Sequence, residues 1–204
     1  MRLVFDIETD DLNATKIWCI VAKDIDTEQV YTYGPNQIDE GCELLSDADE
    51  LIGHNIIGFD IPVLKDLTRF KTLGEGQRIV DTLVLSRLFD PVREAGHGLK
   101  SWGYKLGSSK IDFKDFTGGF SPEMLDYCIQ DVELNLKVYH ALREESRGFS
   151  NESLEIEHAV ALILKEQEKH GFLYDAMELT FFSLTYARWS LRQRQRLSMC
   201  LNQR

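Results

Sequence analysis

The sequence lacks several features that would assign it to a special class of protein. It has no run of about 18 apolar residues, which argues against a membrane-spanning helix. Its first residues, MRLVFDIETDD, lack the charged-then-apolar layout of a signal peptide, so we expect neither secretion nor membrane attachment. Only four cysteines occur, and no two of them form a C-x-x-C pair. Neither a zinc site nor a disulfide framework is indicated, and we expect free buried thiols.

Positive charge is also scarce. Lysine and arginine number 23 against 34 aspartate and glutamate residues, which gives a net charge of −11. This balance argues against a protein that binds nucleic acid through its charge alone. The argument is weaker if some acids hold metal ions, because bound cations offset their charge. Residues 176–204 are an exception, since they contain five arginines and one acid.

The composition suits a folded domain with an appendage, because 43% of the 204 residues are hydrophobic and 10% are aromatic. Strand-like runs alternate with runs of helical periodicity, which predicts an α/β or α+β fold whose first three strands form an antiparallel meander. The predicted strands cover residues 2–9, 17–25, 29–34 and 50–55, the predicted helices cover residues 36–48, 60–70, 96–110, 120–145 and 152–170, and a strand runs into a helix over residues 79–89.

The clearest element is the helix over residues 120–145. Ser121 is a good N-cap, Pro122 suits the first helical position, and apolar residues then recur at helical spacing. The stretch SRGFSNES that follows predicts a break near residue 148. We therefore expect one domain over residues 1–148 and a helical extension with an arginine-rich tail over residues 149–204.

The first strand carries two acids in an otherwise apolar run, VFDIETD. In a strand, Asp6 and Glu8 share one face while Leu3, Phe5 and Ile7 share the other. We expect the apolar face to pack and the other to present the acids. Burying two like charges side by side is costly unless a cation lies between them, which favours a divalent metal. A solvent-facing sheet edge is the alternative.

Three more residues can join these acids. Tyr127 and Asp131 lie four positions apart and therefore on one face of the long helix. Asp60 lies where a strand end turns into a helix, a common position for functional sites in α/β folds. Each has an ordinary alternative: Asp60 could be an N-cap, Asp131 a solvated helix residue and Tyr127 a half-buried aromatic.

Three short motifs, FDIET, HNIIGFD and YCIQD, resemble in their order the exonuclease motifs of the DEDD superfamily of 3′–5′ exonucleases, in its tyrosine branch. The stretches DTLVLSRL, HGLKSWGYKLG and MLDYCIQDV narrow this to a resemblance to the proofreading domain of family A DNA polymerases of T-odd bacteriophages, over about residues 2–145. The resemblance implies a ribonuclease H-like α/β fold, in which a mixed five-stranded sheet is flanked by helices.

The same resemblance implies an activity and a set of site residues. Asp6, Glu8, Asp60 and Asp131 would hold two Mg²⁺ or Mn²⁺ ions, and Tyr127 would bind the attacking water. Hard cations prefer such oxygen ligands, and with no histidine or cysteine nearby the set suits Mg²⁺ or Mn²⁺ better than zinc. The implied reaction is hydrolysis of phosphodiesters at the 3′ end of DNA, as in proofreading during DNA replication.

Substrate contacts are expected around these acids. The resemblance suggests that Asn55 lines the site, while His54 is better explained as a structural histidine. Lysines could follow the phosphates of a frayed single strand and aromatic rings could stack on its bases, although surface lysines are an equal alternative. The candidates are Lys100, Trp102, Tyr104, Lys105, Lys110 and Lys114. Leu12 could separate terminal bases, although core packing is the stronger expectation, and Asp81 is expected to cap the helix that follows it.

Residues 154–175 resemble the helix that opens the polymerase portion of the family, and we expect no polymerase activity from this chain alone. The expected partners are single-stranded DNA or frayed DNA 3′ ends and a separate polymerase subunit. The expected location is the cytoplasm, of the host cell if the chain is encoded by a phage. Two alternatives stay open: a noncatalytic module that assembles with a polymerase, and an RNA exonuclease of the ribonuclease D type.

Overall fold

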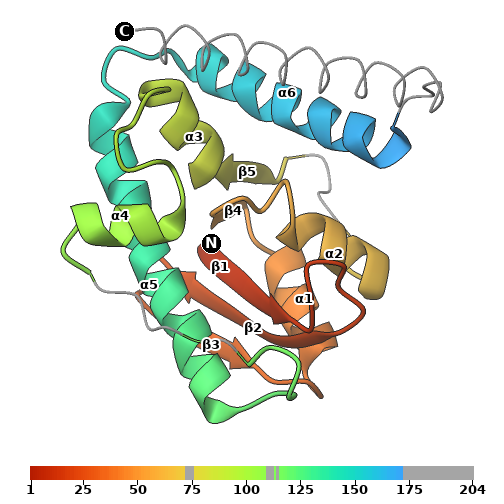
Figure 1. Cartoon of the computed structure of the whole chain (residues 1–204). Coiled ribbons are helices and arrows are strands. Elements are labelled where there is room, and N and C mark those ends of the chain that lie inside the picture. The colour runs from red at the N-terminus through yellow and green to blue at the C-terminus, as the bar shows by residue number, and fades with distance from the viewer. Residues whose placement is uncertain (72–75, 109–112, 114, 172–204) are drawn as a thin grey trace, which may run out of the picture. The chain divides into compact units, whose positions relative to one another are not determined.

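The computed structural model describes residues 1–71, 76–108, 113 and 115–171 (Figure 1). The strands are β1 (Arg2–Thr9), β2 (Ile17–Asp24), β3 (Val30–Tyr33), β4 (Glu50–Gly53) and β5 (Arg78–Asp81). The helices are α1 (Ile38–Ser46), α2 (Asp60–Leu67), α3 (Thr82–Phe89), α4 (Leu99–Lys105), α5 (Pro122–Glu145) and α6 (Asn151–His170). Each predicted strand and helix is present, although several are shorter than predicted.

The strands form one mixed sheet in the order β3-β2-β1-β4-β5. β1 pairs with β2, and β2 with β3, in antiparallel directions, which confirms the predicted meander. β4 pairs in parallel with both β1 and β5. The predicted five-stranded mixed sheet flanked by helices is confirmed, and β1 lies at its centre.

Helices cover both faces of the sheet. On one face, Leu3, Phe5 and Ile7 of β1 belong to a core cluster that includes residues of α1 and α2. On the other face, Val4 packs in a second cluster with residues of α3, α4 and α5, and Figure 1 shows α5 crossing this face. The predicted packing of the apolar face is confirmed, and α5 in addition covers the face that carries the acids.

The long helix α5 begins where the sequence predicts. The Ser121 hydroxyl accepts a hydrogen bond from the backbone N–H of Met124 at 3.2 Å, and Pro122 takes the first helical position. This cap satisfies one of the backbone donors that an α-helix leaves free at its start. It fixes the first turns of α5, which carry Tyr127 and Asp131.

Asp81 connects two elements that support the site. As predicted, it caps α3, because its Oδ1 accepts hydrogen bonds from the N–H groups of Leu83 and Val84. Its carboxylate also accepts from the N–H groups of Asn55 at 2.9 Å and Ile57 at 3.0 Å. Asp81 is 1% exposed. It therefore holds the segment between β4 and α2 in place, and this segment leads directly to Asp60.

The last described helix, α6, differs from the others because none of its residues is buried. The His158 ring accepts a hydrogen bond through Nε2 from the backbone N–H of Asp81 at 2.8 Å. Residues 1–166 form one compact unit, while residues 167–204 form a second, of which only residues 167–171 are described. The predicted arginine-rich tail lies outside the described residues, and the predicted boundary near residue 148 stays a prediction.

Among the described helices, none combines the length and the hydropathy that a transmembrane segment needs.

The role of Asp81 can be tested through stability. Asp81→Ala should destabilise the protein by about 3–5 kcal/mol, because four backbone N–H groups lose a buried charged acceptor. Urea denaturation followed by circular dichroism measures this loss. Glu43→Ala, on the exposed surface of α1, is the matched control and should change stability by no more than about 0.5 kcal/mol. Equal losses in the two variants would contradict the role of Asp81.

Candidate metal centre

Asp6 and Glu8 lie near the end of the central strand β1. They are opposite Val21 and Cys19 of β2 in the antiparallel register. Glu8 is 7% exposed and Asp6 is half-buried. The alternative of a solvent-facing sheet edge is therefore wrong, because β1 has a neighbouring strand on each side. Both carboxylates are on the face that α5 covers.

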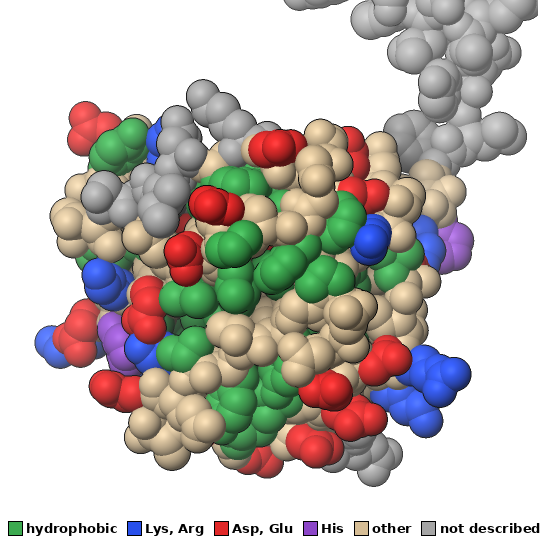
Figure 2. Space-filling model, turned by 90° about the horizontal axis from the view of Figure 1, so that it is seen from below, with side chains coloured by type: hydrophobic (Ala, Val, Ile, Leu, Met, Phe, Trp, Pro, Cys, Tyr) green, Lys and Arg blue, Asp and Glu red, His purple; other side chains and the backbone are tan. Residues whose placement is uncertain are grey.

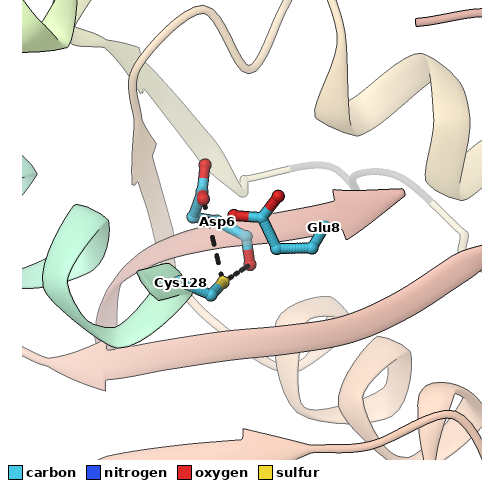
Figure 3. Close-up of side chains that lie close together, drawn as sticks. All are labelled: Asp6, Glu8 and Cys128. Atoms are coloured by element: carbon cyan, nitrogen blue, oxygen red, sulfur yellow. Dashed lines mark hydrogen bonds between the residues drawn. The ribbon is translucent and has the colours of Figure 1, made fainter. Parts of the chain in front are cut away.

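Cys128 of α5 contacts these acids. Its thiol donates hydrogen bonds to the backbone carbonyl of Asp6 at 3.6 Å and to Asp6 Oδ2 at 3.7 Å (Figure 3). Carboxylate oxygens of Asp6 and Glu8 and the Cys128 sulfur all lie within 4.8 Å of one another. Burial, then the Cys19 thiol and the charge of Asp6, raise the pKa of Cys128 well above its usual range. The expectation that no cysteine lies near the acids is wrong.

Helical spacing could have revealed Cys128. It directly follows Tyr127 and precedes Asp131 by three residues, so that the thiol and the carboxylate occupy neighbouring positions on one face of α5. The three buried free cysteines among the described residues, Cys19, Cys42 and Cys128, do confirm the expectation of free thiols.

Tyr127 and Asp131 lie on the face of α5 that also carries Cys128. Asp131 is 5% exposed, so the alternative of a solvated helix residue is wrong. The Tyr127 ring is half-buried, with its centroid 5.8 Å from that of Phe113 and 6.0 Å from that of Phe116. Trp18 fixes this aromatic cluster to β2, because its indole N–H donates to the Phe116 carbonyl at 2.9 Å. Phe113 and Phe116 lie outside the motifs that predict the site residues.

Asp60 approaches the acids of β1 from another element. It is the first residue of α2, and Phe59 occupies the N-cap position, so the N-cap alternative is wrong. Its Oδ1 accepts a hydrogen bond of 3.3 Å from the backbone N–H of Ile7, the residue between Asp6 and Glu8. Asp60 is therefore at the same end of β1 as the other acids.

The Asp60 carboxyl has an unusual protonation equilibrium. Asp60 is 3% exposed. Burial, aided by the charge of Asp81, raises its pKa to about 7, against the opposing effect of backbone N–H groups of Asp60 and Ile7. A buried carboxylate is costly without a cation, and a bound cation would favour the ionised form. A cation bound beside Asp60 would therefore displace its proton near neutral pH.

The residues around β1 suit a divalent cation. Asp6 and Glu8 supply oxygen ligands side by side, and Asp60 and Asp131 supply buried carboxyl groups from two further elements. Carboxylate oxygens are the ligands that Mg²⁺ and Mn²⁺ prefer. Figure 2 shows one face of the molecule, on which acidic side chains surround an apolar surface. An anionic ligand would need cations to approach such acids closely.

The structure places Trp102 in the core and not on a substrate surface. Trp102 is 1% exposed, and its indole N–H donates to Ser86 Oγ at 3.1 Å. The cationic groups of Arg93 and Lys105 lie 4.4 Å and 4.6 Å from the Trp102 ring centroid. A buried ring cannot stack on a base. Lys105 also forms an ion pair with Glu145 at 2.8 Å, which gives it a structural role.

Other predicted substrate residues are accessible. Lys100 is exposed and Tyr104 is 74% exposed. Leu12 is 85% exposed in the loop after β1, so the expectation of core packing for it is wrong. Asn55 is exposed and has a φ of 67°, a left-handed conformation that asparagine tolerates better than most residues.

The sequence also predicts roles for a histidine and for two further lysines. His54 Nδ1 forms a hydrogen bond of 2.9 Å with the Thr82 hydroxyl, as expected of a structural histidine. The predicted substrate residues Lys110 and Lys114 lie outside the described residues.

The protonation of Asp60 predicts how stability depends on pH. A folded-state pKa of about 7, above the usual 3.8, favours folding when Asp60 is protonated. This contribution is complete below about pH 4 and is lost as the pH rises through about 7. In metal-free buffer, the free energy of unfolding should fall between about pH 5 and pH 8, and in Asp60→Asn this fall should be smaller by about 2–4 kcal/mol. Urea denaturation across this range measures the effect.

A matched control separates Asp60 from other acids. Asp39→Asn, at an exposed position in α1, should keep the pH profile of the unchanged protein. Parallel profiles for the unchanged protein and Asp60→Asn would contradict the raised pKa of Asp60.

Comparisons with known proteins agree with these features. No family model matches the chain. It is 27% identical to the DNA-directed DNA polymerases of Escherichia phage T7 and Enterobacteria phage T3, over 93% of this chain and 36% of each relative. The chain thus spans about a third of the length of these relatives.

Solved structures of nucleases share the fold. Brucella melitensis NrnC with bound Mg²⁺ is 21% identical, with a TM-score of 0.63 over 86% of this chain and 89% of that chain. The same protein bound to pGG is 20% identical, with a TM-score of 0.62 over 86% and 88%. Escherichia coli RNase D is 15% identical, with a TM-score of 0.58 over 80% and 44%. The chain is thus homologous to the phage DNA polymerases, and the ribonuclease H-like fold that its motifs predict is confirmed.

Proposed function

We propose that the chain is a metal-dependent 3′–5′ exonuclease that removes nucleotides from DNA. The observation that carries this proposal is the approach of α2 and α5 to the acids of β1: Asp60 of α2 accepts a hydrogen bond from the backbone between Asp6 and Glu8, and Cys128 of α5 contacts Asp6. Such a group of buried acids is costly in a protein that does not use it. Homology to phage DNA polymerases supports an exonuclease and favours DNA as the substrate.

The acids would hold the ions and fix their positions. Asp6, Glu8, Asp60 and Asp131 would provide the ligands for two Mg²⁺ or Mn²⁺ ions. Ions bound there would lower the pKa of a coordinated water and neutralise the phosphate oxygens. The buried carboxyl groups of Glu8, Asp60 and Asp131 are held by packing, so little reorganisation is needed when ligands bind.

Tyr127 would orient the attacking water. Its hydroxyl can donate or accept a hydrogen bond, and the neutral phenol adds no negative charge to a site already rich in acids. Phe113 and Phe116 pack against its ring and restrict the direction of the hydroxyl. We propose positioning of water, and not metal binding, as the role of Tyr127.

The DNA strand would enter from the exposed side of the acids. We propose that Asn55 and Lys100 contact the strand and that Leu12 contacts its terminal base, because all three are exposed. Trp102 is buried, and Lys105, although exposed, is held by its ion pair with Glu145, so we assign neither to the strand. The phage relatives are polymerases of which this chain matches 36%, which supports a polymerase subunit or segment as a partner in proofreading.

The proposed reaction can be tested on labelled DNA. With Mg²⁺ or Mn²⁺, the purified full chain should shorten 5′-labelled single-stranded DNA stepwise from its 3′ end. Asp6→Ala combined with Glu8→Ala should abolish the reaction, because both oxygen ligands on β1 are lost. Gel analysis of the products measures it, and Glu43→Ala is the control for handling and folding. Cleavage that persists in the double variant would contradict the assignment of the acids.

RNA is the second candidate substrate. Two structural neighbours favour it: NrnC, solved with pGG, and RNase D, an exoribonuclease. Matched DNA and RNA oligonucleotides should be compared in the same assay. Faster degradation of RNA would replace the DNA assignment, whereas a folded protein that binds Mn²⁺ but cleaves neither would support the noncatalytic module.

The role of Tyr127 gives a separate prediction. Tyr127→Phe should slow cleavage by about 100-fold, because the water loses one positioned hydrogen bond. The affinity for Mn²⁺ should stay unchanged, since the ring packing is kept. Single-turnover kinetics and isothermal titration calorimetry measure the two quantities. A loss of Mn²⁺ affinity in this variant would show that the hydroxyl acts on the ions instead.

A further inference from the structure

Cys128 is the group in the site that the proposed reaction does not use. It is fully buried, and its sulfur lies 3.7 Å from Asp6 Oδ2. Figure 3 shows the thiol on α5 directed at β1, where Asp6 and Glu8 present their carboxylates. The three side chains come from two elements that both belong to the core of the domain, so their arrangement is part of the fold.

The three groups lie close to the spacing that a tetrahedral site for a soft cation requires. Zinc binds thiolate sulfur at about 2.3 Å and carboxylate oxygen at about 2.0–2.2 Å, which separates neighbouring ligand atoms by about 3.5 Å. The sulfur and Asp6 Oδ2 already have nearly this separation, and all three ligand atoms lie within 4.8 Å of one another. Side-chain rotations that move the ligand atoms by up to about an ångström would complete the site, with water as the fourth ligand.

The thiol changes which cations the site prefers. Carboxylates alone suit Mg²⁺ and Mn²⁺, whereas thiolate is a strong ligand for Zn²⁺ and Cd²⁺ and a weak one for Mg²⁺. We propose that Asp6, Glu8 and Cys128 form a binding site for soft divalent cations, which compete there with Mg²⁺ or Mn²⁺. The proposal shares its two carboxylates with the proposed exonuclease site but does not require that the chain cleave nucleic acid.

The binding step conserves atoms and charge. The S–H bond of Cys128 breaks, its proton passes to water or buffer, and the sulfur electron pair forms the bond to the cation. The thiol also gives up its hydrogen bonds to Asp6, whose carboxylate then binds the same cation. No electron transfer takes place, so no oxidant or reductant is needed.

Cadmium provides a direct readout, because a cadmium–thiolate bond has an ultraviolet charge-transfer absorption that carboxylates lack. The metal-free full chain with Cys42→Ser and Cys200→Ser serves as the reference, since it keeps Cys19 and Cys128. Cd²⁺ should produce the band with one ion per chain, and addition of Cys128→Ser should remove it. A reference protein without the band, or a band that survives Cys128→Ser, would overturn the proposal.

Two further measurements separate a built site from a lone thiol. Asp6→Asn with Glu8→Gln, which keeps Cys128, should weaken Cd²⁺ binding by at least about 10-fold; unchanged binding would overturn the role of the carboxylates. Cys128→Ala should lower Zn²⁺ affinity by at least about 10-fold and leave Mn²⁺ affinity within about 3-fold. Circular dichroism shows whether Cys128→Ser folds, and Cys128→Ala takes its place if it does not. Equal losses of Zn²⁺ and Mn²⁺ affinity in Cys128→Ala would overturn the proposal. These titrations contain no nucleic acid, so their outcome is distinct from a failure of the cleavage assay.

Discussion

The repulsion among carboxyl groups buried at one end of β1 is the constraint on which the rest of the structure depends. Asp81 meets this constraint with four backbone hydrogen bonds, which favour its ionised form although burial raises its pKa. Asp60 receives far less compensation from Ile7, and its pKa is raised to about 7. Asp81 thus has a structural role, whereas Asp60 is the buried acid that we propose as a metal ligand. The difference arises from the number of N–H groups directed at each carboxylate.

The packing of β1 explains how such a costly group is held. Leu3, Phe5 and Ile7 anchor one face of the strand in the core formed with α1 and α2. α5 covers the other face, and it packs against the acids through Cys128, a small side chain that can also donate a hydrogen bond. Because both faces of β1 are packed, its backbone is fixed and keeps Asp6 and Glu8 side by side on one face. Apolar burial on both sides therefore stabilises an arrangement that electrostatics alone would disperse.

Most elements of the fold and the principal acids could be predicted from the sequence, because strand alternation, capping residues and helical spacing are local patterns. The role of Asp60 could not be predicted in this way, since an aspartate before Ile-Pro fits a helix N-cap as well as a site residue. Only its hydrogen bond from the N–H of Ile7, a residue distant in sequence, distinguishes these two roles. Trp102 lies among glycines and lysines, a local sequence typical of a surface, yet Ser86 and Arg93 enclose its ring. The partners of Cys128 are acids on another element, so its spacing from the other cysteines along the chain does not reveal them.

At the proposed site, a proton, a hard cation and a soft cation would therefore compete for overlapping groups. A proton on Asp60 relieves the buried charge without bringing a positive ion to the substrate, so that it stabilises the fold but opposes metal binding. A hard cation would relieve the same charge through Asp6, Glu8 and the other carboxylates, and would thereby couple folding stability to metal concentration. A soft cation would gain the Cys128 sulfur as well, because the thiol already contacts Asp6. The presence of sulfur beside the acids makes metal identity, and not only metal occupancy, a determinant of what this site can do.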